Sequence, residues 1–303
     1  MSKHKLPISV IILTFNEEEN IAACLDTIVD WAGEVFVVDS GSTDRTLDIV
    51  AHYGVTLVSH PFRNYSHQRN WAQTSLPLQH PWVFHIDADE RVSPNLLGEL
   101  RKLFADSDRA GATAGFLVRR MIHFLGRPIT HGGIYPTYHC RIFRKGSGRC
   151  EDREYDQHFL VEGETRRIEA DLIEVTASSL FSWTARHNKW AQMEAVELAR
   201  VERDAPTDMI RARLFGSPVE RRRWLRSRLY GKAPLFVRAL VYFLARYIVR
   251  GGFLDGTPGL IYHFLQGFWF RFYVDACYYE RQQTSPAITE DSQRSCGRTT
   301  ARL

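Results

Sequence analysis

Two carboxylates, Asp87 and Asp89, follow a hydrophobic segment with the composition of a buried strand. The segment WVFHI covers residues 82–86, and one small residue, Ala88, separates the acids. In an extended chain, residues i and i+2 point to the same side, so both carboxylates can converge on one point. Burying two like charges is costly unless a positive charge lies beside them. Because hard carboxylate oxygens suit Mg²⁺ or Mn²⁺, the pair predicts a divalent-metal site, with a solvated turn as the alternative.

Polar side chains also follow two other strand-like segments, ISVIIL at residues 8–13 and VFVV at residues 35–38. After the first come Thr14, Asn16 and Glu17, and after the second come Asp39 and Ser42. The carboxyl ends of parallel strands meet at one edge of a sheet, where α/β folds bind ligands. An acid such as Asp39 can accept a hydrogen bond from a ribose hydroxyl or a base edge, so we expect these side chains to line one crevice. A structural alternative is a plain strand–turn–helix connection, in which Ser42, Thr43 and Asp44 cap the next helix.

The first hundred residues alternate between strand-like and helix-like segments. VTLVSH at residues 55–60 predicts a further strand. Helices are expected at residues 20–30, 40–54, 66–76 and 93–104, the last with Ser93 as N-cap and Pro94 in its first turn. Strands that alternate with helices predict an α/β domain with a mostly parallel sheet and helices on both faces.

The regular alternation of strand-like and helix-like segments does not continue beyond the first hundred residues. Residues from about 115 to 175 combine strand-like segments with turn-rich stretches, which predicts a mixed-sheet extension of the same domain. A long helix is expected after residue 180. We therefore divide the chain into an α/β domain at 1–180, a helical extension at 181–280 and a flexible polar tail at 281–303.

Composition excludes several classes of protein. The 303 residues are 44% hydrophobic and 24% charged, which is ordinary for a globular protein with a core. Five scattered cysteines without a C-x-x-C pair argue against a disulfide framework and a zinc site, and favour a reducing, cytoplasmic setting. The glycine signatures of dinucleotide-binding and P-loop proteins do not occur. The N-terminal apolar run lacks a cleavage site and continues into glutamates, so a first strand is expected there and not a signal peptide.

Residues 211–250 form a basic block with eleven Lys/Arg residues and one acid, Glu220. On a helix through this block, Arg238, Arg246 and Arg250 would fall within about 120° of arc beside an apolar face. Such a pattern is typical of an interfacial helix, so the block is expected to bind an anionic membrane surface. An ordinary packed helix pair with solvated arginines is the alternative. No nucleic-acid recognition motif accompanies the charge, so no nucleic-acid partner is expected.

Several motifs, in order along the chain, resemble those of the inverting family 2 glycosyltransferases of the GT-A fold. The motifs are ISVIILTFNEEENI, VFVVDSGSTDRT, HQRNWA and HIDADERVSP. Two later stretches, GRPITHGGIYPTYHCRIFRKG and GGFLDGTPGL, resemble the bacterial branch that contains the lipopolysaccharide-core β-glucosyltransferases and related exopolysaccharide enzymes. The resemblance spans roughly residues 7–275. It implies a nucleotide-sugar donor, often UDP-linked, and a divalent metal.

The resemblance also implies roles for individual residues. The nucleoside pocket would be lined by Thr14, Asn16, Glu17 and Asp39, with Ser42 in the same loop as Asp39. Arg69, in HQRN, would lie nearby and face the donor. Asp87 would approach the ribose or the metal, and Asp89 would coordinate the metal on the diphosphate.

The reaction that such a site runs is a direct displacement at the anomeric carbon of the sugar. The metal acts as a Lewis acid on the departing diphosphate, and a carboxylate removes the proton of the acceptor hydroxyl. Candidate bases lie in CEDREYDQHF, where we favour Asp156, then Asp152, with Glu151 as a third candidate. The relatives tend to carry a His-Glu pair where this chain has Asp156-Gln157, so a charged surface turn is the alternative.

We therefore expect a metal-dependent glycosyltransferase that moves a sugar, with inversion, from a nucleotide-diphosphate donor. The acceptor would be a lipopolysaccharide, exopolysaccharide or lipid-linked glycan at the inner face of the cytoplasmic membrane. One alternative is a sugar nucleotidyltransferase, which would usually show a Gly-rich phosphate loop near the first strand. Another is a non-catalytic membrane-surface binding module built around residues 211–250.

Overall fold

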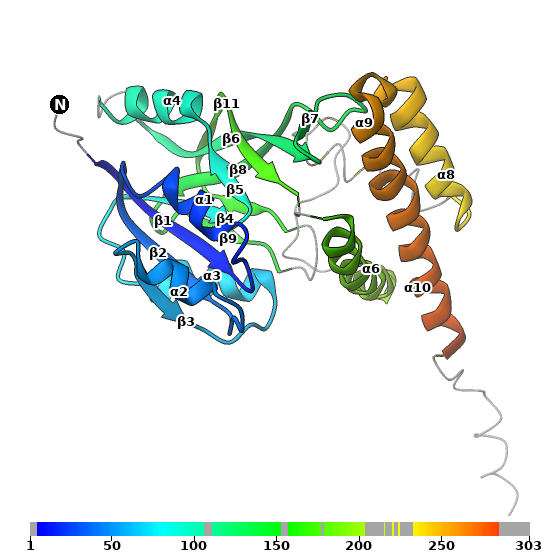
Figure 1. Ribbon diagram of the computed structural model, residues 1–303, viewed down its shortest axis with the longest axis horizontal. Helices are drawn as coiled ribbons and strands as arrows, with labels where there is room; N and C mark the ends of the chain where they lie inside the picture. The colour runs from blue at the N-terminus through cyan, green and yellow to red at the C-terminus, as the bar shows by residue number, and fades with distance from the viewer. Residues whose placement is uncertain are drawn as a thin grey trace, which may run out of the picture.

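The computed structural model describes residues 5–105, 111–152, 157–176, 179–203, 215, 220, 224 and 233–284. A large sheet with helices on both faces forms the N-terminal part, and further helices pack beside it (Figure 1). The sheet is parallel in its N-terminal half and mixed beyond it, which confirms the predicted α/β fold with a helical C-terminal extension. None of the described helices combines the length and the apolar character needed to cross a lipid bilayer.

The strands of the large sheet follow the order β3–β2–β1–β4–β8–β6–β11–β5, and β7 pairs with β6. In that order their bounds are Thr56–Ser59, Ala32–Asp39, Leu6–Thr14, Trp82–Asp87, Thr137–Arg144, Thr113–Phe124, Glu164–Val175 and Glu90–Val92, with Arg127–Ile129 for β7. A separate ribbon pairs β9 (Gly148–Cys150) with β10 (Phe159–Val161). Each strand predicted from the sequence is present, and the mixed extension enters the sheet through β8, which pairs antiparallel with β4.

Alternate residues of the central strands pack on opposite faces of the sheet, which explains why these strands appear in the sequence as continuous apolar runs. From β1, Ile8, Val10 and Ile12 enter one core, and Ile11 enters the other. The first face is covered by α1 (Ile21–Asp26), α2 (Thr46–Ala51) and α4 (Pro94–Phe104), and the second by α3 (Tyr65–Ser75). Because both faces are covered, the ends of the strands are where polar side chains of the sheet can reach a ligand.

The helix starts follow the predicted capping only in part. Ser93 caps α4 as expected, since its Oγ accepts a hydrogen bond from the N–H of Leu96 at 3.1 Å. The helix after β2 begins only at Thr46, with Arg45 and not Ser42 as its N-cap. α1 is likewise shorter than predicted. The residues in front of α1 and α2 hydrogen-bond to each other across two loops, which keeps them out of the helices.

The helical extension begins with α6 and ends with a pair of helices. Its elements are α6 (Leu180–Arg203), α8 (Val237–Leu244), η2 (Ala245–Val249), η3 (Gly252–Asp255), α9 (Gly256–Tyr262), η4 (His263–Trp269) and α10 (Phe270–Thr284). We call residues 237–284 the helix hairpin, because α8–η2 runs alongside α9–η4–α10 and η3 forms the turn between them (Figure 1). α10 extends to Thr284, so the start of the segment expected as a tail is helical, and residues 285–303 lie outside the described residues.

The arginines of the helix hairpin differ from the prediction, because two of them point into the protein. Arg238 is 6% exposed, and its Nε donates to Asp275 Oδ1 at 2.8 Å. Arg246 is 8% exposed, and its Nε donates to the carbonyl oxygen of Gly132 at 3.0 Å. Of the expected cationic stripe, only Arg250 is exposed. Buried guanidinium groups need such partners, and these partners come from segments distant in the chain. Most of residues 211–232 lie outside the described residues.

Asp255 fastens the turn of the helix hairpin to the loop after β7. Its carboxylate accepts hydrogen bonds from the N–H groups of Thr130 and His131 at 3.1 and 2.9 Å, and from Thr130 Oγ1 at 3.1 Å. His131 Nδ1 lies 2.6 Å from the same carboxylate. The ring of the buried His263 lies 4.0 Å from Asp255, and a Cβ at Gly132 would overlap it. The two stretches GRPITHGGIYP and GGFLDGTPGL therefore form one contact.

We expect Asp255→Ala to destabilise the protein, because it removes the acceptor of two backbone N–H groups at this junction. The free energy of unfolding should fall by about 2–4 kcal/mol, measured by urea denaturation. Asp255→Asn keeps one carbonyl oxygen and should lose clearly less. Equal stability of the wild type and the alanine variant would contradict the role assigned to this contact.

Candidate active site

An acidic rim forms where β1, β2 and β4 end side by side. Backbone pairing places Thr14 opposite Asp39, and Leu13 opposite Asp87. Thr14 and Asp39 are 4% and 2% exposed, so both are almost fully enclosed. The structure thus brings these predicted residues together at the carboxyl edge of the parallel half of the sheet, where α/β folds bind ligands.

Two loops at this rim hold each other through side-chain hydrogen bonds. Asp39 accepts hydrogen bonds from the N–H groups of Gly41 and Ser42 at 2.8 and 2.9 Å, and Ser42 Oγ also donates to it. Asn16 has a φ of 53°, a left-handed conformation that asparagine tolerates better than most residues. Its Oδ1 accepts from the N–H of Thr43 at 2.8 Å, and its own N–H donates to Ser42 Oγ at 2.9 Å. Ser42 therefore joins the two loops and does not cap α2.

Two guanidinium groups neutralise Asp87. Nη2 of Arg69, in α3, donates to both carboxylate oxygens at 2.9 and 3.1 Å, and Nη2 of Arg141, in β8, donates to Oδ2 at 3.0 Å. Burial raises the pKa of Asp87, but the two arginines outweigh burial and hold this pKa well below its usual range. Arg141 also donates to Glu90 at 2.6 Å, and Glu90 accepts from the N–H of Asp87 at 2.9 Å. Asp87 is therefore an ionised carboxylate held by two guanidinium groups, and its backbone N–H is held by Glu90.

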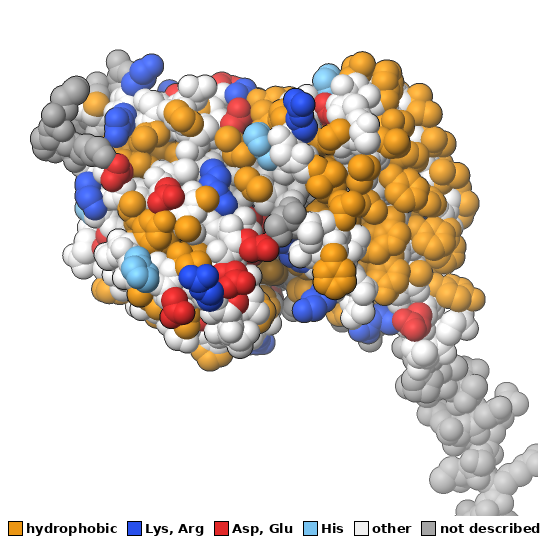
Figure 2. Space-filling model, viewed as in Figure 1, with side chains coloured by type: hydrophobic (Ala, Val, Ile, Leu, Met, Phe, Trp, Pro, Cys, Tyr) orange, Lys and Arg blue, Asp and Glu red, His pale blue; other side chains and the backbone are white. Residues whose placement is uncertain are grey.

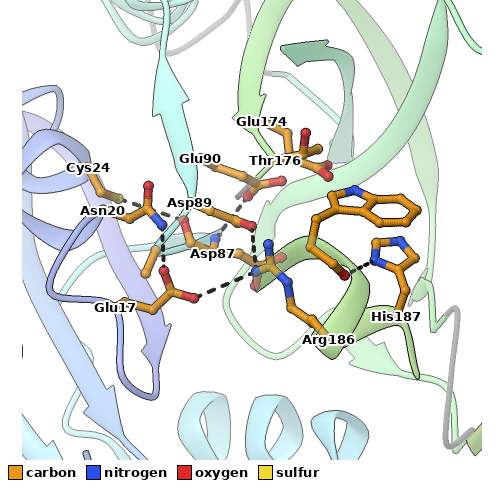
Figure 3. Close-up of polar contacts among 12 residues, drawn as sticks. Glu17, Asn20, Cys24, Asp87, Asp89, Glu90, Glu174, Thr176, Arg186 and His187 are labelled. Carbon is orange, nitrogen blue, oxygen red and sulfur yellow. Dashed lines mark hydrogen bonds and ion pairs between the residues drawn. The ribbon is translucent and has the colours of Figure 1, made fainter. Parts of the chain in front are cut away.

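Asp89 reaches the site from a turn between β4 and β5 and not from an extended strand, which corrects the expected strand alternation. Arg186, from α6, extends between Asp89 and Glu17 (Figure 3). Its Nη1 lies 3.5 Å from Asp89 Oδ2 and 3.9 Å from Glu17 Oε1. Burial, together with the charges of Glu174 and Glu17, raises the pKa of Asp89 well above its usual value. Burial likewise raises the pKa of Glu17.

Asp89 and Glu17 form the part of the rim that suits a divalent cation. Their pKa values are raised, and a cation beside them would favour their ionised forms. Among the residues that the structure describes, no group of three or more His, Cys, Asp or Glu side chains could hold a metal ion. An ion here would therefore complete its coordination shell with oxygen atoms of the bound nucleotide sugar and with water, as Mg²⁺ commonly does. Both oxygens of Asp87 accept hydrogen bonds from arginines, so a direct metal bond from Asp87 stays a prediction.

A small pocket lies beside the two arginines that bind Asp87. It is lined by Arg69, His139, Cys140, Arg141, Gln157, His158 and Phe159. Its wall at residues 157–159 directly follows Asp156 in the chain. The pocket therefore joins the arginine-bound end of β4 to the segment that carries the candidate bases. Arg69, which was expected to face the donor, points to Asp87 and lines this pocket.

The three candidate bases have different surroundings. Asp156 lies outside the described residues. The side chain of Asp152 is 67% exposed, and its Oδ2 lies 3.8 Å from Arg200 of α6. Glu151 is fully buried and accepts a hydrogen bond from the N–H of His158 at 2.9 Å, which suits a structural role.

Sequence reasoning missed three charged residues of the site: Glu90, Arg141 and Arg186. The pattern YHCRIFR gave one usable signal, because an arginine inside a strand beside buried Ile142 and Phe143 needs a buried partner. Arg186 carried no local signal, because its position next to Asp89 depends on how α6 packs against the sheet.

We expect Arg141→Ala to cost about 3–5 kcal/mol of unfolding free energy, since it leaves Glu90 and Asp87 short of a buried partner. The matched control is Arg119→Ala, because the Arg119 side chain is 23% exposed, against 11% for Arg141. Loss of its ion pair with Asp171, at 2.7 Å, should cost about 1 kcal/mol or less. Urea midpoints measure both. Equal losses of stability in the two variants would contradict the role given to Arg141 in neutralising Asp87 and Glu90.

Comparison with known proteins identifies the N-terminal part. Residues 9–155 match the family model described as glycosyl transferase family 2. The lipopolysaccharide core biosynthesis glycosyltransferase LpsC of Rhizobium meliloti (strain 1021) is 26% identical over 279 residues, which cover 86% of this chain and 90% of that protein. An uncharacterized glycosyltransferase of Rickettsia bellii (strain RML369-C) is 36% identical over 102 residues, which cover 34% of each chain.

Two solved structures are similar over most of the chain. Mannosyltransferase PcManGT from Pyrobaculum calidifontis, solved with GDP-Man and Mn²⁺, has a TM-score of 0.48 at 16% identity and covers 92% of this chain and 88% of its own. S. aureus TarS 1-349, solved with UDP-GlcNAc, has a TM-score of 0.46 at 14% identity and covers 91% of each chain. Residues 9–155, which form most of the large sheet and the helices on its faces, are thus similar to a glycosyltransferase domain of family 2.

Proposed function

We propose that this enzyme transfers a sugar from a nucleotide-diphosphate donor, with UDP as the expected nucleotide, to a glycan or glycolipid acceptor. The observation that carries the proposal is the rim at the ends of β1, β2 and β4. There an ionised Asp87, fixed by Arg69 and Arg141, lies next to a second carboxylate, Asp89, with a raised pKa. This arrangement suits the ribose and diphosphate of a nucleotide sugar, which need hydrogen-bond acceptors and positive charge side by side.

Different residues of the rim would bind different parts of the nucleotide sugar. Thr14, Asn16 and Asp39 line the edge where a nucleoside would lie, and the loop around Ser42 fixes their positions. Arg69 and Arg141 keep Asp87 ionised, so Asp87 can accept a hydrogen bond from a sugar hydroxyl at neutral pH. A divalent metal, held by Asp89 with Asp87 or Glu17 beside it, would supply Lewis-acid stabilisation of the departing diphosphate.

Transfer with inversion requires a base on the side of the sugar away from the diphosphate. We assign this role to Asp156, with Asp152 as the second candidate. The pocket lined by Arg69, Arg141 and residues 157–159 supports this choice, because it connects the nucleotide rim to the chain that follows Asp156. The carboxylate would take the proton of the attacking acceptor hydroxyl.

The acceptor class follows from the relative that matches most of the chain. LpsC of Rhizobium meliloti acts in lipopolysaccharide core biosynthesis by its name, and it is similar over 86% of this chain, including the helical extension. We infer a lipopolysaccharide-core, exopolysaccharide or lipid-linked acceptor. Such an acceptor would place the enzyme in the cytoplasm, at the inner face of the cytoplasmic membrane.

Donor hydrolysis across a panel of nucleotide sugars tests the donor and the metal together. We expect free UDP, and not pyrophosphate, to be released from one donor, and we expect excess chelator to stop the release. Asp89→Asn should lower kcat/KM by about 100-fold or more, because the charge that balances the cation is lost. Asp48→Asn, at an exposed acid of α2, is the matched control and should be unaffected. Pyrophosphate release would favour a nucleotidyltransferase, and no product from any donor would favour a non-catalytic membrane module. An Asp89→Asn variant as active as the wild type would contradict the metal-binding role of Asp89.

Paired variants of the two candidate bases test the assignment of the proton acceptor. Asp156→Asn should reduce transfer to a glycolipid acceptor by about 10²–10⁴-fold while nucleotide affinity stays close to that of the wild type. Asp152→Asn should have the smaller effect, since its carboxylate is largely exposed. The reverse order would make Asp152 the base, and two unaffected variants would exclude this segment from proton transfer.

A further inference from the structure

The outer surface of the helix hairpin is apolar, while its inner surface carries charge. α8 buries Arg238, and η2 buries Arg246, against partners inside the protein. The exposed large hydrophobic residues of the same helices and turn, with exposures of 40–82%, are Val237, Leu240, Val241, Leu244, Ile248, Val249, Phe253, Leu254, Leu260, Phe264 and Phe272. We call these residues the hairpin face. A helix in contact with water normally has the opposite arrangement, with its apolar side inward.

The hairpin face is continuous and almost free of charge. Figure 2 shows hydrophobic side chains covering the outside of the helices in this part of the molecule, in contrast to the mixed surface over the sheet. Two of the three acids of the helix hairpin, Asp255 and Asp275, have side chains that are 3% and 1% exposed, and the third, Glu280, is exposed near the end of α10. Soluble monomers rarely expose apolar patches of this extent unless the patch binds a partner or a membrane.

The two most exposed apolar side chains of the hairpin face belong to Val249, just before the turn, and Leu254, in the turn. Val249 is 82% exposed, Leu254 is 61% exposed and Phe253 is 51% exposed. Asp255 and Arg246 lock this turn onto the loop after β7. A surface that binds these side chains would therefore also orient the sheet that carries the acidic rim.

We propose that the hairpin face seats in a lipid surface, with the turn at residues 248–254 inserted into the boundary between headgroups and acyl chains. Interfacial helices bind in this way, through an apolar face flanked by cationic residues. The inference rests on the proposed function in one respect, since a lipid-linked acceptor must be met at a membrane. The contact with lipid is then made by apolar side chains and not by the expected stripe of arginines, two of which are buried.

Charge favours lipid over a second copy of the chain as the occupant. The sequence that leads into the hairpin, residues 211–232, contains eight Lys/Arg residues and one acid. Arg250 is exposed at the turn. In a second helix hairpin the exposed acid is Glu280, near the end of α10 and away from the turn, whereas an anionic leaflet supplies negative charge next to an apolar interior along the whole face.

Flotation of the full chain with vesicles tests the inference. The probes are phosphatidylcholine vesicles with and without phosphatidylglycerol, and the variant is Val249→Asp with Leu254→Asp. Both positions are exposed, so the fold should persist, which far-UV circular dichroism and UDP release in vesicle-free solution will verify. We expect the variant to bind vesicles at least about 10-fold more weakly than the wild type. The control, Leu57→Asp with Phe62→Asp, changes two exposed apolar residues on the sheet domain and should stay within about twofold.

Three results would overturn the inference. The wild type could fail to bind either vesicle, or the turn variant could bind as the wild type does. Light scattering could also reveal a wild-type dimer that the turn variant disperses without any vesicle binding, which would assign the face to a second copy. Vesicle binding without donor turnover would count against the proposed function alone and leave the lipid surface standing.

Discussion

The neutralisation of Asp87 by two buried guanidinium groups is the interaction on which the site depends. A carboxylate at the end of a buried strand is costly unless opposite charge lies against it. Arg69 comes from α3 and Arg141 from β8, on two different elements. The antiparallel pairing of β8 with β4 brings Arg141 to the end of β4, so the mixed half of the sheet contributes directly to the rim built by the parallel half.

A second charge balance extends the site beyond the sheet. Asp89 and Glu17 are both kept partly out of water, and Arg186 of α6 lies between them. The rim is therefore completed by the helical extension and does not belong to the N-terminal half of the chain alone. α6 in turn packs on α10 through a small core around Ala191, so the geometry at Asp89 is linked to the position of the helix hairpin.

In the helix hairpin, as at the rim, buried charged groups are paired with partners of opposite charge or with backbone carbonyl oxygens. Its buried charged side chains have partners inside the protein, as in the ion pair of Arg238 with Asp275, and many of its apolar side chains face outward. Asp255 clamps the turn to the loop after β7. The hairpin face and the acidic rim are thus connected through the contact of Asp255 with the loop after β7.

Local patterns in the amino-acid sequence were enough to predict the strands, the helices that cover them and the meeting of Asp39 and Asp87 at one edge. These follow from local periodicity and from the rule that parallel strands end on the same side. The partners of the charged side chains, in contrast, became known from the folded chain: Arg141 lies beside Asp87, and Arg238 points inward to Asp275. Periodicity shows that a helix has two faces but not which one faces the protein, because that choice depends on contacts between segments far apart in the chain. The same long-range contacts placed Arg186, which no local pattern could locate.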